Sequence, residues 1–195
     1  MSEPPKQRTL TDDARATFNI ASMGAHCLST LCEVFLHEGF GCRYLGVGAA
    51  INLLLIPCWC IFWPDRNATP LLLFWAAYLL ALIKARWSAA RDGKPPFVHS
   101  RYRGTPILLR WFPKANERRM RFSTEPLLVI VTGALTCVCS DPVLGSLLIV
   151  AGFGHSARMC LGEAVAQAQA QDTFDAMVEQ EDHADRVRRM RREWY

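Results

Sequence analysis

Charged side chains are almost missing from four stretches of this chain of 195 residues, although they make up 21% of its composition. The four stretches are residues 44–63, 70–83, 126–139 and 142–159. The overall content of 51% hydrophobic residues would not by itself separate a membrane protein from a soluble one. The uneven distribution of charge indicates a membrane protein, because long uncharged segments suit the hydrocarbon layer.

The sequence also lacks the short motifs that identify common enzymes and cofactor sites. It contains no P-loop and no dinucleotide-binding glycine pattern. Residues 154–158 depart from the nucleophile elbow at their last position, which is Arg158 instead of glycine, and this excludes serine hydrolysis of that type. We therefore expect no catalytic residues and no cofactor. We also expect no nucleic-acid partner, because no nucleic-acid-binding module accompanies the arginines.

The first apolar segment, residues 44–63, has 20 residues and one strongly polar side chain, Asn52. At 1.5 Å per residue, a helix of this length reaches about 30 Å, the thickness of the hydrocarbon layer. The second segment, residues 70–83, is shorter, but Lys84 and Arg86 can extend their charged ends toward the headgroups. The short linker between the two segments predicts an antiparallel hairpin.

Residues 126–159 predict a second hairpin, because Ser140, Asp141 and Pro142 form a turn between two apolar runs. Runs this short leave two alternatives open, a re-entrant hairpin and a pair of core helices in a soluble protein. The expected fold class is an all-α integral membrane protein. It has two short helical hairpins, about four transmembrane segments, and amphipathic helices at the N-terminal and C-terminal ends.

Positive charge is concentrated between the two hairpins. Residues 84–125 contain eleven Lys or Arg and three acidic residues. The positive-inside rule places this stretch in the cytoplasm. Both termini then lie in the cytoplasm as well, with the protein in a plasma or inner membrane. The expected organisation is an N-terminal cytoplasmic or interfacial helix (1–43), a first transmembrane hairpin (44–87), a basic cytoplasmic loop (88–125), a second transmembrane hairpin (126–159) and a charged C-terminal cytoplasmic helix (160–195).

The basic loop and the two terminal helices are the parts that reach beyond the hairpins. The arginines of the loop flank an apolar patch, so we expect them to contact anionic lipid at the headgroup level, with an acidic protein partner as the alternative. The N-terminal helix is expected to pack on the protein's own segments or on a partner. The C-terminal helix is expected to be a solvated surface helix or a partner-binding helix. The loop arginines are Arg101, Arg103, Arg110, Arg118, Arg119 and Arg121.

Polar residues and thiols inside the apolar segments are the candidates for chemistry. Ionisable groups in a membrane often carry function, although a hydrogen bond between helices explains an isolated polar residue equally well. Two Cys-x-Cys pairs near the outer ends of their segments could supply a disulfide or a soft-metal site. Packing is the simpler interpretation, because residues two apart on a helix point in different directions. The candidates are Asn52, His155, Cys58, Cys60, Cys137 and Cys139.

Three functions remain open at this point. The leading expectation is a non-enzymatic subunit or scaffold of a larger membrane assembly, which forms homo- or hetero-oligomers through small-residue helix faces such as that of Gly145 and Gly152. The first alternative is a small oligomeric transporter or channel that uses Asn52 and His155. The second alternative is a thiol-redox or metal protein that uses the outward-facing cysteines. The lipid bilayer is the partner common to all three.

Overall fold

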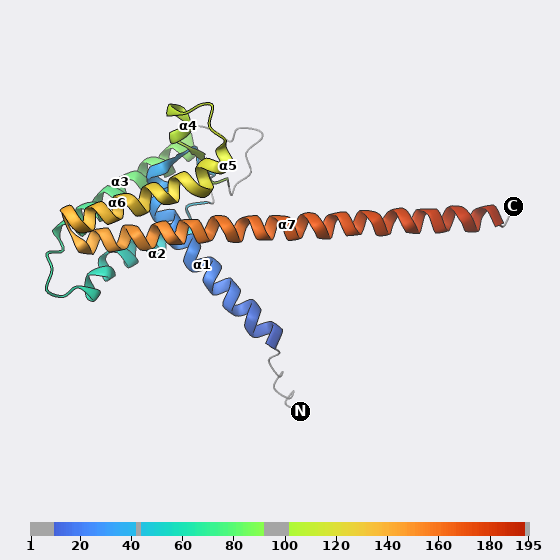
Figure 1. Ribbon diagram of the computed structural model, residues 1–195, viewed down its shortest axis with the longest axis horizontal. Helices are drawn as coiled ribbons and strands as arrows, with labels where there is room; N and C mark the ends of the chain where they lie inside the picture. Colours follow the sequence, from blue (N-terminus) through green and yellow to red (C-terminus); the bar gives the residue numbers. More distant parts are fainter. Residues whose placement is uncertain (1–9, 42–43, 92–101, 194–195) are drawn as a thin grey trace. The chain divides into compact units, whose positions relative to one another are not determined.

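The computed structural model describes residues 10–41, 44–91 and 102–193, and this part of the chain is mostly helical (Figure 1). The longer helices are α1 (Leu10–Leu36), α2 (Val47–Cys58), α3 (Thr69–Arg91), α6 (Glu125–Cys139) and α7 (Pro142–Glu193). The shorter elements are the 3₁₀-helix η1 (Trp59–Phe62), α4 (Leu108–Trp111), α5 (Glu117–Arg119), the π-helix η2 (Met120–Thr124) and the strands β1 (His37–Glu38) and β2 (Thr105–Pro106). The two strands pair in antiparallel fashion and are a small exception to the expected all-helical class, which is otherwise confirmed.

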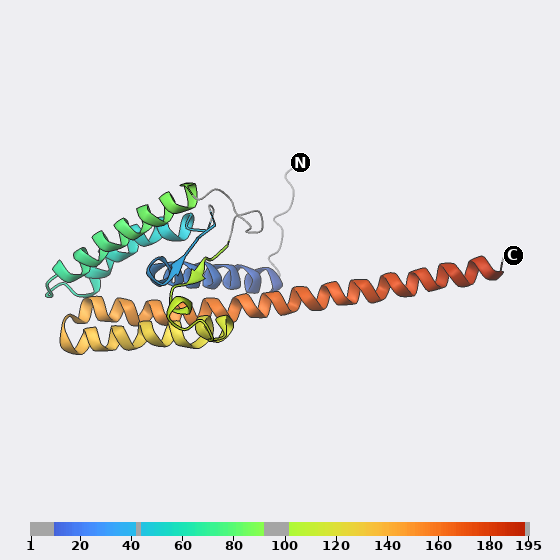
Figure 2. The same cartoon turned by 90° about the horizontal axis from the view of Figure 1, so that it is seen from above.

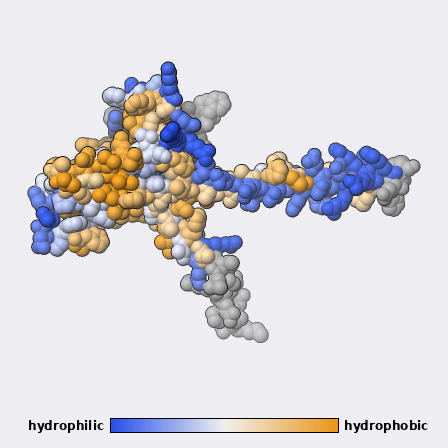
Figure 3. Space-filling view, in the orientation of Figure 1, coloured by the Kyte–Doolittle hydropathy of each residue, from blue (hydrophilic) through white to orange (hydrophobic). Residues whose placement is uncertain are grey.

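Three helical stretches are long and apolar enough to cross a membrane, judged by length and composition. They are Thr69–Ala90, Glu117–Cys139 and Pro142–Arg192, and Val47–Phe62 is a shorter apolar helix. Only 11% of the apolar window in Thr69–Ala90 is buried inside the protein. Figure 3 shows hydrophobic residues gathered over the region of α6 and the first turns of α7. Association with a membrane follows from this exposed apolar surface, whereas four complete crossings stay a prediction.

The first apolar segment differs from the regular helix that was expected over residues 44–63. The α-helix begins at Val47 and gives way to the 3₁₀-helix η1 after Cys58. Pro57 lies at this change, and a proline inside a helix removes a backbone hydrogen bond. Tyr44 and Leu45, which were assigned to the membrane segment, are buried against the rest of the protein.

The C-terminal half of α1 forms the centre of the first structural unit, which extends to Met159. Residues 29–34 are all buried, so this half of the helix is enclosed on every side. It packs against α2 and α3, and its Leu28 side chain meets Gly154 of α7. From the sequence, this helix was expected to pack on the protein's own segments or on a partner, and the C-terminal half does pack on the protein's own segments. Its buried residues include the polar side chains of Ser29, Thr30 and Glu33.

The hairpin of α6 and the start of α7 is packed unusually closely, and the two helices lie side by side in both ribbon views (Figures 1 and 2). A Cβ atom added at Gly145 would lie 2.5 Å from both the backbone nitrogen and the Sγ of Cys137. At the turn, the Asp141 carboxylate accepts a hydrogen bond of 2.9 Å from the backbone N–H of Leu144, which caps α7. The small-residue face of Gly145 is therefore used within the chain, and oligomerisation through such faces stays a prediction.

The close approach at Gly145 predicts the effect of a single methyl group. Gly145→Ala should lower the stability of the purified protein in detergent by about 1–3 kcal/mol, because overpacking forces the two backbones apart. Gly24→Ala is the matched control, since Gly24 lies in α1 with no atom within 4 Å of an added Cβ. The control should be neutral or slightly stabilising, because alanine favours helix. Equal thermal midpoints for both variants would contradict the close packing.

The second unit, Cys160–Tyr195, is the C-terminal part of α7 and is described through Glu193. Every side chain from residue 164 to 192 is exposed. Acidic residues occupy its middle and arginines its last turns, and the arginines suit the C-terminal end of the helix dipole. The exposed apolar side chains of this unit are Val165, Phe174, Met177, Val178, Val187 and Met190.

Candidate functional site

Two buried carboxylates and two buried histidines form a connected polar network inside the first unit. Ser29 and Glu33 are four residues apart and lie on one face of α1, and His37 follows four residues later as the first residue of β1. Glu125 is the first residue of α6, and His155 lies in α7. The side chains of Glu33, Glu125 and His155 are 0% exposed, and that of His37 is 2% exposed. Elements that are far apart in the sequence thus place four ionisable side chains at one interior site.

His155 lies between the two carboxylates. Its Nδ1 is 2.8 Å from the Ser29 hydroxyl and 3.5 Å from Oε1 of Glu33. The Ser29 hydroxyl donates to the same Glu33 oxygen at 2.6 Å, so the imidazole N–H donates to Ser29. On its other side, Nε2 of His155 is 3.4 Å from Oε2 of Glu125, although it makes no hydrogen bond of good geometry there. The ring therefore joins α1 to α6 electrostatically.

His37 completes the network at the start of β1. Its Nε2 is 3.0 and 3.1 Å from the two oxygens of Glu125, and its Nδ1 is 3.0 Å from the backbone carbonyl oxygen of Arg103. Both ring nitrogens thus lie within hydrogen-bond distance of oxygen atoms. The ring of His37 therefore joins Glu125 and β1 to the segment that leads into β2.

Glu33 has a pKa well below the ordinary value of a glutamate. Burial alone raises the pKa of this carboxyl, but the interactions with His155, the charge of His37 and the hydrogen bond from Ser29 outweigh it and lower the pKa to about 2. The Tyr44 hydroxyl also donates a short hydrogen bond to Glu33. Burial, followed by the adjacent negative charge, raises the pKa of Tyr44. Glu33 is thus an ionised carboxylate and Tyr44 a neutral donor.

Asn52, a candidate from the sequence, belongs to a second, smaller polar cluster. Its amide nitrogen donates to the backbone carbonyl oxygen of Cys27 at 2.7 Å and to the Thr30 hydroxyl at 2.8 Å, and it lies 3.4 Å from the Tyr78 hydroxyl. These contacts join α1, α2 and α3. A hydrogen bond between helices, the structural alternative considered for Asn52, accounts for its position.

The cysteine candidates do not form a chemical site in the described part of the chain. All four are free thiols, and Cys137 contacts the carbonyl oxygen of Pro142 at 3.7 Å. Cys58 and Cys139 are exposed on their helices. Among the described residues, no group of three or more His, Cys, Asp or Glu side chains is arranged to hold a metal ion.

The loop arginines do not gather on one surface. Arg121 turns inward, where it donates to the Gly104 carbonyl oxygen and to Glu117, both at 2.6 Å. Arg103 approaches the Met159 sulfur at 3.4 Å. Arg110 and Arg119 are exposed, as is Arg118, which lies over the Phe122 ring at 5.8 Å from its centroid. Arg101 lies outside the described residues.

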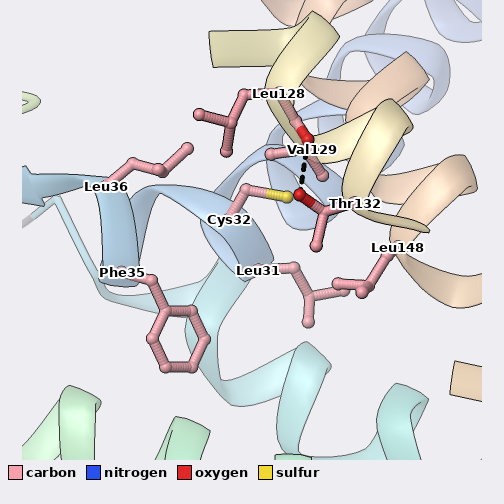
Figure 4. A pocket seen from close by; sticks show the side chains of 8 residues that line it. All are labelled: Leu31, Cys32, Phe35, Leu36, Leu128, Val129, Thr132 and Leu148. Carbon is pink, nitrogen blue, oxygen red and sulfur yellow. Dashed lines mark hydrogen bonds between the residues drawn. The ribbon is translucent and has the colours of Figure 1, made fainter. Parts of the chain in front are cut away.

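An apolar pocket of about 110 Å³ lies beside the network, between α1 and the α6–α7 hairpin (Figure 4). Its one hydroxyl, that of Thr132, already donates to the backbone carbonyl oxygen of Leu128 at 2.7 Å. The pocket therefore offers no free polar group for a hydrophilic ligand. Its lining residues are Leu31, Cys32, Phe35, Leu36, Leu128, Val129, Thr132 and Leu148.

Sequence reasoning identified His155 but missed its partners. The four-residue spacing of Ser29, Glu33 and His37 was a usable signal, since it places polar groups on one helix face. Glu125 gave no such signal, because a carboxylate just before an apolar run looks like an ordinary flanking charge. Comparison of the chain with protein-family models, with curated proteins and with solved structures finds no match.

The network predicts a large cost for neutralising one buried carboxylate. Glu33→Gln removes one of the two carboxylates beside His155 and should destabilise the protein by about 3 kcal/mol, because breaking a buried ion pair leaves charge less well compensated in an apolar interior. Glu117→Gln makes the same chemical change at a carboxylate that is half exposed and paired with Arg121, and should cost less than about 1 kcal/mol. Denaturant unfolding in detergent measures both, and equal losses would rule out the network as a stabilising element.

The low pKa of Glu33 also predicts a dependence of stability on pH. The ordinary value is 4.5 and the folded value is about 2, so the unfolded state binds the proton first as pH falls. The contribution of Glu33 is therefore complete above pH 4.5 and is lost progressively as pH falls toward 2. Thermal midpoints of the wild-type protein should decline through this range more steeply than those of Glu33→Gln. Parallel declines would mean that other carboxyl groups control acid unfolding.

Proposed function

We propose that the protein is a non-enzymatic scaffold subunit of a larger membrane assembly, in which residues 160–193 form a helical docking arm. The observation that carries the proposal is the exposure of every side chain from residue 164 to 192 along an unbroken helix. Helices in proteins owe most of their stability to packing of one face against another element. A long helix without such packing in its own unit is suited to receive a partner.

The arm carries a specific contact surface. Phe174, Met177 and Val178 are spaced i, i+3 and i+4, so they adjoin on one side of the helix. Their exposed fractions are 62%, 56% and 44%. Residues 172–185 contain six acidic residues and no lysine or arginine. We infer a partner helix that has apolar residues along its contact face and basic residues at the margins, because this partner would complement both features.

The interior of the first unit supports a scaffold over a transporter. Glu33, His37, Glu125 and His155 lie within 3.0–3.5 Å of one another in carboxylate–imidazole pairs, and the pocket beside them is apolar. A transporter is the second candidate. One observation favours it, namely that several ionisable groups lie next to one another inside a membrane protein. The scaffold is favoured because the pocket beside that series is lined by apolar side chains, and its one hydroxyl already donates to a backbone carbonyl oxygen.

Purification of the full-length protein in mild detergent, followed by native mass determination, tests the arm. The wild-type protein should carry a stoichiometric protein partner. Changing Phe174, Met177 and Val178 together to Gln should remove that partner. The control variant Val187→Gln with Met190→Gln, which alters exposed apolar residues elsewhere on the same helix, should keep it.

Two outcomes would count against the scaffold. Retention of the partner by the Phe174, Met177 and Val178 variant would refute the proposed contact surface. A homo-oligomer without any partner, combined with solute or proton flux in vesicles that is lost in His155→Leu, would assign the protein to the transporter class instead.

A further inference from the structure

A second group of basic side chains lies where α1 meets α7, and the buried network does not use it. Arg158 extends its Nη1 to within 3.5 Å of the Ser22 hydroxyl on α1. Arg103 places its Nη1 3.4 Å from the sulfur of Met159, the residue next to Arg158. His26 follows Ser22 by one helical turn, on the same side of α1. Two guanidinium groups, an imidazole and a hydroxyl are thus brought to one junction, the α1–α7 crevice.

The positive charge of the α1–α7 crevice is only partly compensated within the described residues. None of their carboxylates forms an ion pair with Arg103 or Arg158, although the negative charge of Glu33 acts on His26 and Arg158. The nearest acid in the network, Glu33, already accepts from Tyr44 and Ser29. Two polar atoms of the crevice, Nε of Arg158 and Nδ1 of His26, are buried without a hydrogen-bond partner. Buried polar atoms without partners are rare in proteins, and the Nε–H of Arg158, which can only donate, indicates a missing acceptor.

The pKa of His26 is lowered, which agrees with an excess of positive charge around its ring. Burial lowers the pKa of this imidazole, and the charges of Arg158 and Arg103 lower it further against the opposing effect of Glu33. The side chains of Ser22, His26, Arg103 and Arg158 are all partly exposed, so a ligand can reach them. An anion in the crevice would relieve the repulsion between the two arginines and accept from the unsatisfied donors.

The crevice adjoins the point where an apolar helix begins. The Tyr44 ring lies edge-on to His26 at 5.5 Å between centroids, and α2 starts three residues later, at Val47. Arg86, near the basic end of α3, donates to the Leu45 carbonyl oxygen at 2.8 Å. Arginines at the ends of apolar helices meet the headgroup region of a bilayer, where the phosphates lie.

We propose that Arg103 and Arg158, with Ser22 and His26, bind the phosphate group of an anionic phospholipid. Guanidinium groups bind phosphate oxygens through paired hydrogen bonds, and the Ser22 hydroxyl and the unsatisfied His26 nitrogen supply further polar contacts. The acyl chains of such a lipid would lie along the exposed apolar surface of the membrane unit. This site is independent of the docking arm, and either assignment can fail without the other.

The test uses the full-length protein in a neutral detergent, titrated with phosphatidylglycerol or with phosphatidylcholine and read by native mass spectrometry. The wild-type protein should retain one phosphatidylglycerol in preference to phosphatidylcholine. The double variant Arg103→Gln with Arg158→Gln should weaken phosphatidylglycerol binding by about tenfold or more, since each arginine near an anionic headgroup contributes about a fivefold change. The control Arg110→Gln with Arg119→Gln removes the same charge from exposed positions and should keep the preference.

Ser22→Asp is a second variant, which tests the site even if the double variant fails to fold. It places a carboxylate beside Arg158, so it should fold as well as the wild-type protein in lipid-free detergent and still lose phosphatidylglycerol binding. Wild-type binding by both Ser22→Asp and the double variant would overturn the proposal. Displacement of the lipid by inorganic phosphate at equal concentration would overturn its assignment to a phospholipid and assign the crevice to free phosphate.

Discussion

Two carboxylates, Glu33 and Glu125, lie fully buried in a unit whose surroundings are otherwise largely apolar. An ionised carboxylate in such a place costs several kcal/mol unless charges and hydrogen bonds compensate it. The compensation comes from His37 and His155, whose positions depend on β1 and α7. The relative placement of α1, α6 and α7 therefore has to satisfy this network, and a shift of any one of these helices would leave a buried charge without its partner.

The other contacts of the first unit are consistent with that requirement. Asn52 joins α1 to α2 and α3 through hydrogen bonds, so the first hairpin is attached to the same central helix. Gly145 and Gly152 allow α6 and α7 to approach closely along the hairpin, and at its open end Glu125 lies 3.4 Å from His155. Helix association inside a membrane depends on close packing and polar contacts, because lipid is as apolar as the helix surface. The unit combines both.

Charge is thus handled in two different ways. In the interior, each carboxylate lies beside a histidine. In the α1–α7 crevice, Arg103 and Arg158 form no ion pair with a carboxylate of the described residues, and on the arm the charges are separated into an acidic and a basic stretch. The compensated charges serve the fold. The charges of the crevice and of the arm lie at surfaces, where a lipid or a protein can supply further partners.

The sequence alone determined the helical class, the apolar segments and the concentration of basic residues between them, because each depends on local composition and spacing. It also identified Asn52 and His155 as polar residues in apolar surroundings. Only the tertiary structure decided what they contact. Ser29 and His155 are 126 positions apart, and His37 and Glu125 are 88 apart. No local pattern records such a pairing, since burial and electrostatic compensation arise only when distant helices pack together.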